Sequence, residues 1–269
     1  DLTLRYVVPG HPVSFECDVP VASAQKDKFM AQTTVFTPGG YRYIPAVFQY
    51  SGGVATEPGM AIERVMFTKP LPLAQGFREV ERIIKAAGRP LTAFCACELR
   101  SPAQFTSDGF RAFNRHYVGT LETWGIFRND VNPVARSNVC PEIGAPAEPC
   151  FHAFAFTVKE ARAPSFVVAG SGEVPEGTGI YGDNIVARGD ISPAGIRRKA
   201  QAVLTEMERR LGLLGFAWTD TELDDSNLAV GICAQCTVTD PIVVIAASNR
   251  DLRVEVPPSI TYQLTKAPL

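Results

Sequence analysis

Hydrophobic and polar residues follow two different periods along this chain, and each period predicts a different kind of element. In the first 48 residues, short segments alternate apolar and polar positions, are rich in β-branched residues, and are separated by Pro and Gly. Such segments are typical of strands. The expected strands are Leu4–Val8, Ser14–Val19, Thr33–Thr37 and Tyr43–Phe48.

The period changes from residue 73 onward. Apolar residues there recur at spacings of three and four, and charged residues occupy the positions between them. This spacing predicts an amphipathic helix from Leu73 that ends at Gly88, with Pro90 just beyond it. A strand at Leu91–Leu99 and a second helix capped by Ser107 and Asp108 are expected next. Two further strands are expected, at Ser137–Val139 and Cys150–Val158.

The same order then begins again. Phe166–Gly172 repeats the strand and Ser-Gly turn of Phe48–Gly52, and Ser51 and Ser171 are 120 positions apart. Ser192 and Pro193 predict the start of another helix, and Gly215 its end. We therefore predict two halves. The first, residues 1–160, carries an N-terminal extension, and the second, residues 161–269, lacks a counterpart of the second helix and is degenerate.

The composition limits the classes of function. A hydrophobic content of 46% with 20% charged residues is typical of a globular domain. The formal charge of −2 supplies no basic field, so no nucleic-acid partner is expected. Because no apolar run reaches about 18 residues, no membrane span is expected either. The first nine residues lack the pattern of a secretory signal. The chain has seven cysteines, but at this length it can bury an adequate core without disulfides, so reduced thiols and a cytoplasmic location are expected.

The cysteines leave two chemical alternatives open. Cys95, Cys97, Cys233 and Cys236 could form a four-thiolate zinc site. However, Cys95 and Cys97 lie in an apolar strand pattern that suits packing equally well, so we expect no metal. Cys140 and Cys150 flank a turn-rich segment, where a nucleophilic thiol is the second alternative. No His partner for either thiol is evident from the sequence.

Four phrases together carry a family resemblance. In chain order they are Phe48-Gln49-Tyr50-Ser51-Gly52, Ala86-Ala87-Gly88, Phe113-Asn114-Arg115-His116-Tyr117 and Pro133-Val134-Ala135-Arg136-Ser137. Their order and intervals resemble the RidA/YjgF family of enamine and imine deaminases, which includes 2-aminomuconate deaminases. The resemblance implies an α+β fold made of two RidA-like (chorismate mutase-like) halves, each a mixed sheet with helices packed on one face. It also implies a homo-oligomer, with a trimer favoured.

The resemblance implies a site as well. Arg136 would bind a substrate carboxylate, and Ser51 and Tyr50 would contact the substrate, although Tyr41 and Tyr43 are alternatives to Tyr50. Asn138 stands where the family often has Cys. Counting from Pro146, His152 stands where the family often has a carboxylate. Asn138 or His152 would position water or move a proton.

Each of these assignments has a plain structural alternative. An arginine such as Arg136 is often a surface residue paired with an acid, and His152 could be a half-buried strand residue bonded to a backbone carbonyl. A Ser-Gly pair, as at Ser51, suits any tight turn. Asn114 and His116 are expected to be structural or to lie between subunits.

The expected function is hydrolytic deamination of an enamine or imine amino acid that bears a carboxylate. The preferred substrate is 2-aminomuconate or a substituted analogue from aromatic-ring degradation, and no cofactor is expected. One alternative is a chorismatase-like or ring-cleavage-product hydrolase on the same fold. Another, from a different class, is a non-catalytic ligand-binding or scaffold protein.

Overall fold

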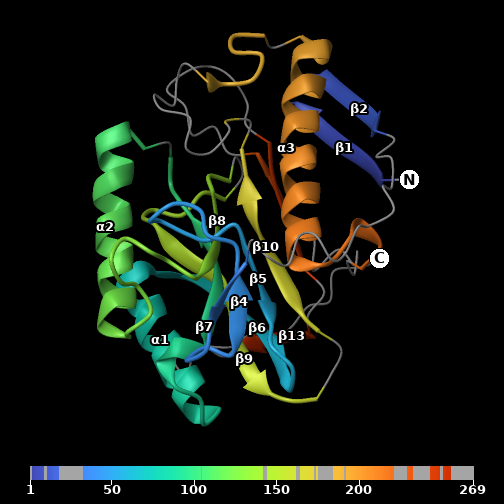
Figure 1. Ribbon diagram of the computed structural model, residues 1–269. Coiled ribbons are helices and arrows are strands. Elements are labelled where there is room, and N and C mark those ends of the chain that lie inside the picture. The colour runs from blue at the N-terminus through green and yellow to red at the C-terminus, as the bar shows by residue number, and fades with distance from the viewer. Residues whose placement is uncertain are drawn as a thin grey trace.

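Two sheets form the centre of the molecule, as seen in the computed structural model (Figure 1). The structure describes residues 2–8, 11–17, 33–103, 105–141, 144–161, 164–172, 174, 184–190, 192–220, 229–232, 243–248 and 251–255. Figure 1 shows helices α1 (Leu73–Ala86) and α2 (Ser107–Thr123) on one side of the strands and α3 (Pro193–Leu214) on the other.

The first sheet has six strands in the order β11-β12-β10-β5-β4-β3. In chain order these strands are β3 (Thr34–Phe36), β4 (Tyr41–Tyr43), β5 (Gly53–Thr56), β10 (Phe166–Ser171), β11 (Ala229–Ile232) and β12 (Val243–Ser248). All of its pairings between neighbouring strands are antiparallel.

The second sheet has five strands in the order β13-β6-β9-β7-β8. They are β6 (Met60–Pro72), β7 (Phe94–Arg100), β8 (Ala135–Val139), β9 (Cys150–Lys159) and β13 (Asp251–Glu255). This sheet is mixed, because β7 pairs with β8 and β13 pairs with β6 in parallel while β9 is antiparallel to both of its neighbours. Strands β1 (Leu2–Val8) and β2 (His11–Cys17) form a separate antiparallel pair.

The expected α+β class is confirmed by this arrangement. Each large sheet combines strands from both sides of residue 160, since β10 pairs with β5 and β13 pairs with β6. A parallel bridge between Ser51 and Ala135 connects the turn before β5 to β8. The division into halves at 1–160 and 161–269, the trimer and the cytoplasmic location stay predictions.

Three groups of buried side chains hold the layers together. The largest lies between the five-stranded sheet and helices α1 and α2, and includes Phe77, Tyr117 and Phe154. A second group joins α3 to the six-stranded sheet. The third contains small and aromatic residues from both sheets, among them Val54 and Ala155, and fills the space between the sheets. Each sheet is therefore covered by helices on one face and by the other sheet on the opposite face.

The helix ends largely follow the expected signals. Helix α1 is followed by Gly88 at a φ of 66°, a left-handed value that favours glycine. Ser192 caps α3 by accepting from Gly195 N, and Gly215 ends the helix at a φ of 87°. The prediction that Ser107 and Asp108 cap α2 was wrong. Thr106 is the cap, with its side chain accepting from Gly109 N, and Asp108 lies in the first turn.

Two strand predictions also need correction. The expected strand at Leu91–Leu99 starts later, because residues Leu91–Ala93 form a 3₁₀ turn before β7. Of the expected strand at Tyr43–Phe48, only Tyr43 lies in a strand, as the last residue of β4, and the residues after it form no extended strand. A second 3₁₀ turn, Trp218–Asp220, follows α3.

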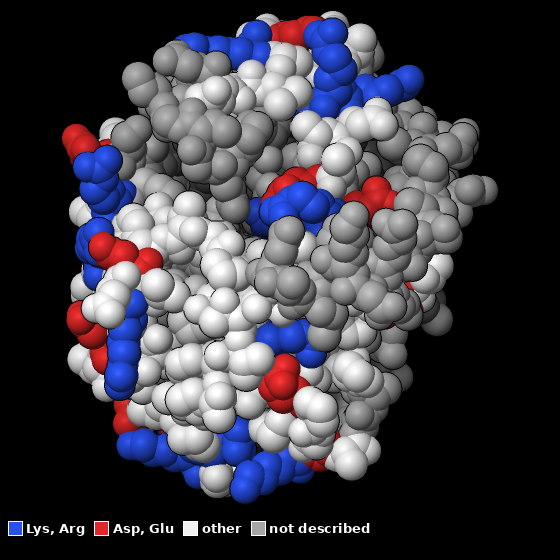
Figure 2. All heavy atoms as spheres, in the orientation of Figure 1, with Lys and Arg blue, Asp and Glu red and all other residues white. Residues whose placement is uncertain are grey.

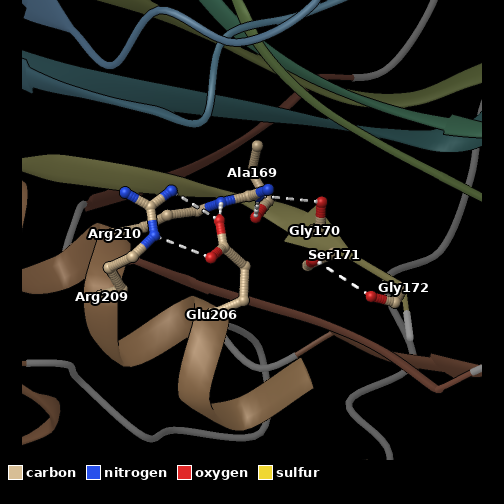
Figure 3. A network of polar contacts seen from close by, with 7 residues as sticks. All are labelled: Ala169, Gly170, Ser171, Gly172, Glu206, Arg209 and Arg210. Atoms are coloured by element: carbon tan, nitrogen blue, oxygen red, sulfur yellow. Dashed lines mark hydrogen bonds and ion pairs between the residues drawn. The ribbon is translucent and has the colours of Figure 1, made fainter. Parts of the chain in front are cut away.

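A polar network attaches α3 to β10 (Figure 3). Arg210 is fully buried, and its Nη1 donates to the carbonyl oxygens of Ala169 at 2.9 Å and Gly170 at 3.2 Å. Its Nε donates to Glu206 Oε1 at 2.8 Å, and Arg209 binds the same carboxylate from the exposed side of the helix. The network satisfies backbone oxygens near the end of β10.

The surface carries charges of both signs. Figure 2 shows basic and acidic side chains interspersed along the side that α1 and α2 form, with an uncharged area beside them. In the described part of the chain, no helix is long and apolar enough to cross a membrane.

Candidate functional site

Strand β8 directs Arg136 and Asn138 toward α2. In the parallel register with β7, Arg136 lies opposite Cys97 and Asn138 opposite Leu99. Side chains of directly paired strand residues point to the same face of a sheet. Because Cys97 and Leu99 belong to the core under α1 and α2, Arg136 and Asn138 also face these helices.

The guanidinium of Arg136 is buried among aromatic rings. Arg136 is only 4% exposed. The guanidinium carbon lies 4.8 Å from the centre of the Tyr117 ring, 5.7 Å from that of Tyr50 and 5.9 Å from that of Phe113. Cation–π attraction to these rings offsets part of the cost of taking the charge out of water.

No counter-ion accompanies this cation within the described residues. Arg136 forms no ion pair there, and its buried Nη1 has no hydrogen-bond partner. A buried polar donor without a partner costs free energy, as does an unpaired buried charge. The arrangement therefore suits an anion that arrives from outside the chain, and a carboxylate matches the guanidinium geometry.

Local sequence explains how the rings reach Arg136. Phe113 and Tyr117 are four positions apart on α2 and therefore share one helix face. Tyr50 is held by the next residue, Ser51, which is fully buried. The Ser51 amide donates to Val134 O at 2.8 Å and its hydroxyl donates to Pro133 O at 3.0 Å. The Ser51 hydroxyl thus fixes the turn beside β8.

Asn138 offers a second donor on the same strand face. Its Oδ1 accepts a hydrogen bond from Ser101 Oγ at 2.9 Å, which orients the amide. Its Nδ2 is buried and has no partner among the described residues. Residues two apart on a strand are about 7 Å apart. At this spacing, Arg136 Nη1 and Asn138 Nδ2 can donate hydrogen bonds to two parts of one small ligand.

Three further residues, Tyr117, Cys97 and Asn114, lie at or next to this group, and the sequence analysis did not assign them to the site. Tyr117 contacts Arg136 through its ring and Cys97 Sγ through its hydroxyl, at 3.3 Å. Asn114, three positions before Tyr117 on α2, is fully buried, and its Oδ1 has no partner in the described part of the chain. Its polar amide within the apolar stripe of α2 was the available signal.

Burial keeps the groups beside Arg136 uncharged. It raises the pKa of the Cys97 thiol to about 12, although the Tyr117 hydroxyl and the Arg136 charge oppose that shift. Burial also raises the pKa of Tyr117 well above its usual value, and the neighbouring Cys97 adds to the effect. Both groups are protonated at neutral pH and therefore supply no negative charge to compensate Arg136.

His152 lies on the opposite face of the five-stranded sheet. It occupies an irregular position of β9, because the registers to β6 and β7 both shift there. Burial and the charges of Arg100 and Arg64 lower its pKa to about 4, against the opposing effect of Glu98. The structure thus brings Arg136, Tyr50, Ser51 and Asn138 together and places His152 in a separate charged group.

Of the cysteines in the two alternatives, Cys97 lies beside Arg136, and the others lie apart from this group or outside the described residues. Cys150 is buried, and burial raises the pKa of its thiol. Cys140 is half-buried, with its Sγ donating to Ala103 O at 3.2 Å. Cys233 and Cys236 of the zinc alternative are not among the described residues. Within the part that is described, no three or more His, Cys, Asp or Glu residues gather where they could hold a metal ion.

Fold and site together define an α+β protein with a buried arginine that has no counter-ion among the described residues. A sequence profile of the family "2-aminomuconate deaminase CnbZ" matches residues 33–247, and the chain belongs to this family. It is 54% identical over 194 residues to a 2-amino-5-chloromuconate deaminase of Comamonas testosteroni. That alignment covers 71% of this chain and 77% of the relative. No solved structure matches the chain.

The family assignment confirms the resemblance to deaminases of the 2-aminomuconate type. It also identifies the chain as a member of a family of enzymes that act on a C–N bond. The interpretation of the sequence as two successive copies of one domain stays a prediction.

Proposed function

We propose that this protein is a hydrolytic deaminase of 2-aminomuconate or a substituted analogue, with Arg136 as the carboxylate-binding residue. The observation that carries the proposal is the guanidinium of Arg136, buried against three aromatic rings with a donor left unpaired. The activity named for the family and for its Comamonas testosteroni member supports the substrate class.

The reaction needs few groups from the protein. The enamine of the substrate takes up a proton at carbon and becomes an imine. Water then adds to the imine carbon, and ammonia leaves to give a 2-oxo acid, so that one water is consumed for each ammonia released. The imine carbon is already electrophilic, and the chemistry therefore requires no cofactor.

Each site residue has a distinct part in this proposal. Arg136 holds the carboxylate adjacent to the reacting carbon, and the unpaired Nδ2 of Asn138 orients the water or the amine on the same strand face. Tyr50 stacks near the guanidinium, and Ser51 keeps that ring in place through its bond to Pro133. We assign no step to His152, because the charged groups that act on it, Arg100, Glu98 and Arg64, are on the other face of the sheet.

The test is ammonia release from freshly generated 2-aminomuconate, followed together with the ultraviolet spectrum of the substrate. Wild-type protein should release ammonia faster than the spontaneous rate. Arg136→Met should lower kcat/KM by about 100-fold, because charge-assisted bonds to the carboxylate contribute about 3 kcal/mol. Arg136→Lys should recover only part of the loss, since an ammonium cannot bind the carboxylate with two parallel donors.

A matched control is Arg82→Met on α1. The side chain of Arg82 is 45% exposed and is paired with Glu79, and it has no part in the proposed site. The Arg82→Met variant should retain full activity. Full activity in Arg136→Met would refute the assignment of Arg136, and no acceleration by wild-type protein with either 2-aminomuconate or 2-aminoacrylate would refute the deaminase itself.

A further inference from the structure

A second charged group lies between the two sheets, on the face of the five-stranded sheet opposite Arg136. Arg64 on β6 binds Glu98 on β7 with two nitrogens, and its Nη2 is 2.7 Å from Glu98 Oε2. Arg100 Nη2 approaches the same oxygen at 4.0 Å. The charges of these arginines and of Glu98 also act on His152.

The register of the strands places these side chains on one face. Glu98 is paired with Ser137 on β8 and with Ala153 on β9, and Arg64 is paired with Ala155. Ala155 belongs to the core between the sheets, so this face looks toward the six-stranded sheet. Ser137 therefore sits beside Glu98, while its neighbours in sequence point toward α2.

Three buried polar atoms in or beside this group have no hydrogen-bond partner among the described residues. Arg64 is 3% exposed, and its Nη1 makes no hydrogen bond within the described residues. Ser137 is 7% exposed, and its Oγ likewise has no partner there. Thr68 Oγ1, in the irregular part of β6 opposite His152, is a third such atom. Native structures seldom leave several buried polar atoms of one cluster unsatisfied.

The side chains of this cluster also carry a net positive charge. At neutral pH the cluster contains two arginines, one glutamate and a neutral imidazole, since the pKa of His152 is about 4. These four side chains sum to one positive charge. The cluster is reachable from solvent, because the side chains of Arg100 and Glu98 are 14% and 17% exposed.

We propose that this cluster, comprising Arg64, Arg100, His152 and Ser137 with Glu98, binds the carboxylate of a small organic acid at a site separate from that of Arg136. A carboxylate would neutralise the excess charge. It would accept hydrogen bonds from the free Nη1 of Arg64 and from the Ser137 hydroxyl. Glu98 fixes the orientation of Arg64 so that this nitrogen is directed away from the existing ion pair.

His152 provides a spectroscopic reporter for this site. The chain has three histidines, and His152→Gln identifies the imidazole signal of this one in an NMR spectrum. The probe is formate added to the full-length protein at pH 7, with sodium chloride at equal ionic strength as the control. We expect a saturable shift of the His152 signal with formate. A shift that is linear in formate, or one that chloride reproduces, would overturn the proposal.

Three variants locate the bound anion. Arg100→Met should abolish the saturable shift, and Ser137→Ala, which removes one hydroxyl, should weaken formate binding about tenfold. Arg136→Met should leave the formate affinity at His152 unchanged. Loss of the shift in Arg136→Met, or an unchanged affinity in Ser137→Ala, would refute a separate site. The deaminase proposal does not enter this test, because binding is measured without turnover.

Discussion

The guanidinium carbon of Arg136 lies 4.8 Å from the centre of the Tyr117 ring, and no acidic side chain of the described residues pairs with it. A buried cation in contact with an aromatic face but without a counter-ion is costly for the folded state. Such a cost is common at sites that bind charged ligands, where function is gained at the expense of stability.

This relationship predicts that Arg136→Met is more stable than the wild-type protein. Methionine has a similar length and needs no counter-ion, so the free energy of unfolding should rise by about 1–2 kcal/mol. Urea unfolding of both proteins at pH 7 measures the difference. If Arg136 were a structural residue paired within the fold, the substitution would instead lower stability by several kcal/mol.

The two functions of Tyr117 can be separated by two substitutions. Tyr117→Phe removes only the hydroxyl and its contact with Cys97, and should cost about 1 kcal/mol of stability while leaving KM within twofold. Tyr117→Leu removes the ring from the guanidinium. It should raise KM for 2-aminomuconate about 30-fold, since desolvated cation–π contacts contribute about 2 kcal/mol. Equal KM values for the two variants would show that the ring does not assist Arg136.

Cys97 should resist alkylation in the folded protein. Its thiol is buried and has a pKa of about 12, so almost no thiolate exists at pH 8. Iodoacetamide at that pH, followed by peptide mass spectrometry, should label half-buried Cys140 well before Cys97. Labelling of both in urea is the control for peptide detection. Rapid modification of Cys97 without urea would contradict the buried position beside Tyr117.

Much of the local structure could be predicted from the sequence. The three- and four-residue spacing from Leu73 indicated α1, and Ser192 and Gly215 marked the ends of α3, because these signals act within a few residues. The phrase around Arg136 also led to the buried arginine. The strand partners could not be predicted in this way. Pairing of β10 with β5 and of β13 with β6 depends on contacts between distant segments.

The sequence also could not predict on which face of the sheet a strand residue lies. Counting from Pro146 placed His152 on the last strand of the first half, and β9 contains it. The count gives no information on the register shifts in β6 and β7 next to that position. Since one extra residue reverses the direction of the following side chains, the grouping of His152 with Glu98 and Arg100 was inaccessible to sequence reasoning.

The depressed pKa of His152 predicts a pH dependence of stability. An imidazole in the unfolded chain has a pKa near 6.5, whereas that of folded His152 is about 4. Between these values the unfolded state binds more protons, so stability is highest above pH 6.5 and falls as the pH decreases toward 4. After allowance for partial solvent contact, the loss should be about 2 kcal/mol.

Two histidine variants measure the contribution of His152 to this pH dependence. His152→Gln should reduce the loss of stability between pH 6.5 and pH 4, measured by urea unfolding. His116→Gln, on the exposed face of α2, is the matched control and should retain the wild-type slope. An identical slope in His152→Gln would show that the imidazole of His152 is not held in its neutral form by burial and the neighbouring arginines.

The two arginines of the network in Figure 3 offer a paired test of burial. Arg209 and Arg210 both bind Glu206, but their side chains are 49% and 0% exposed. Arg209→Met should change the free energy of unfolding by less than about 0.5 kcal/mol, as is usual for exposed ion pairs. Arg210→Met should cost about 3 kcal/mol, because it removes donors from the buried carbonyls of Ala169 and Gly170. Urea unfolding of both variants measures the two effects, and similar values would mean that α3 is held to β10 by its apolar contacts alone.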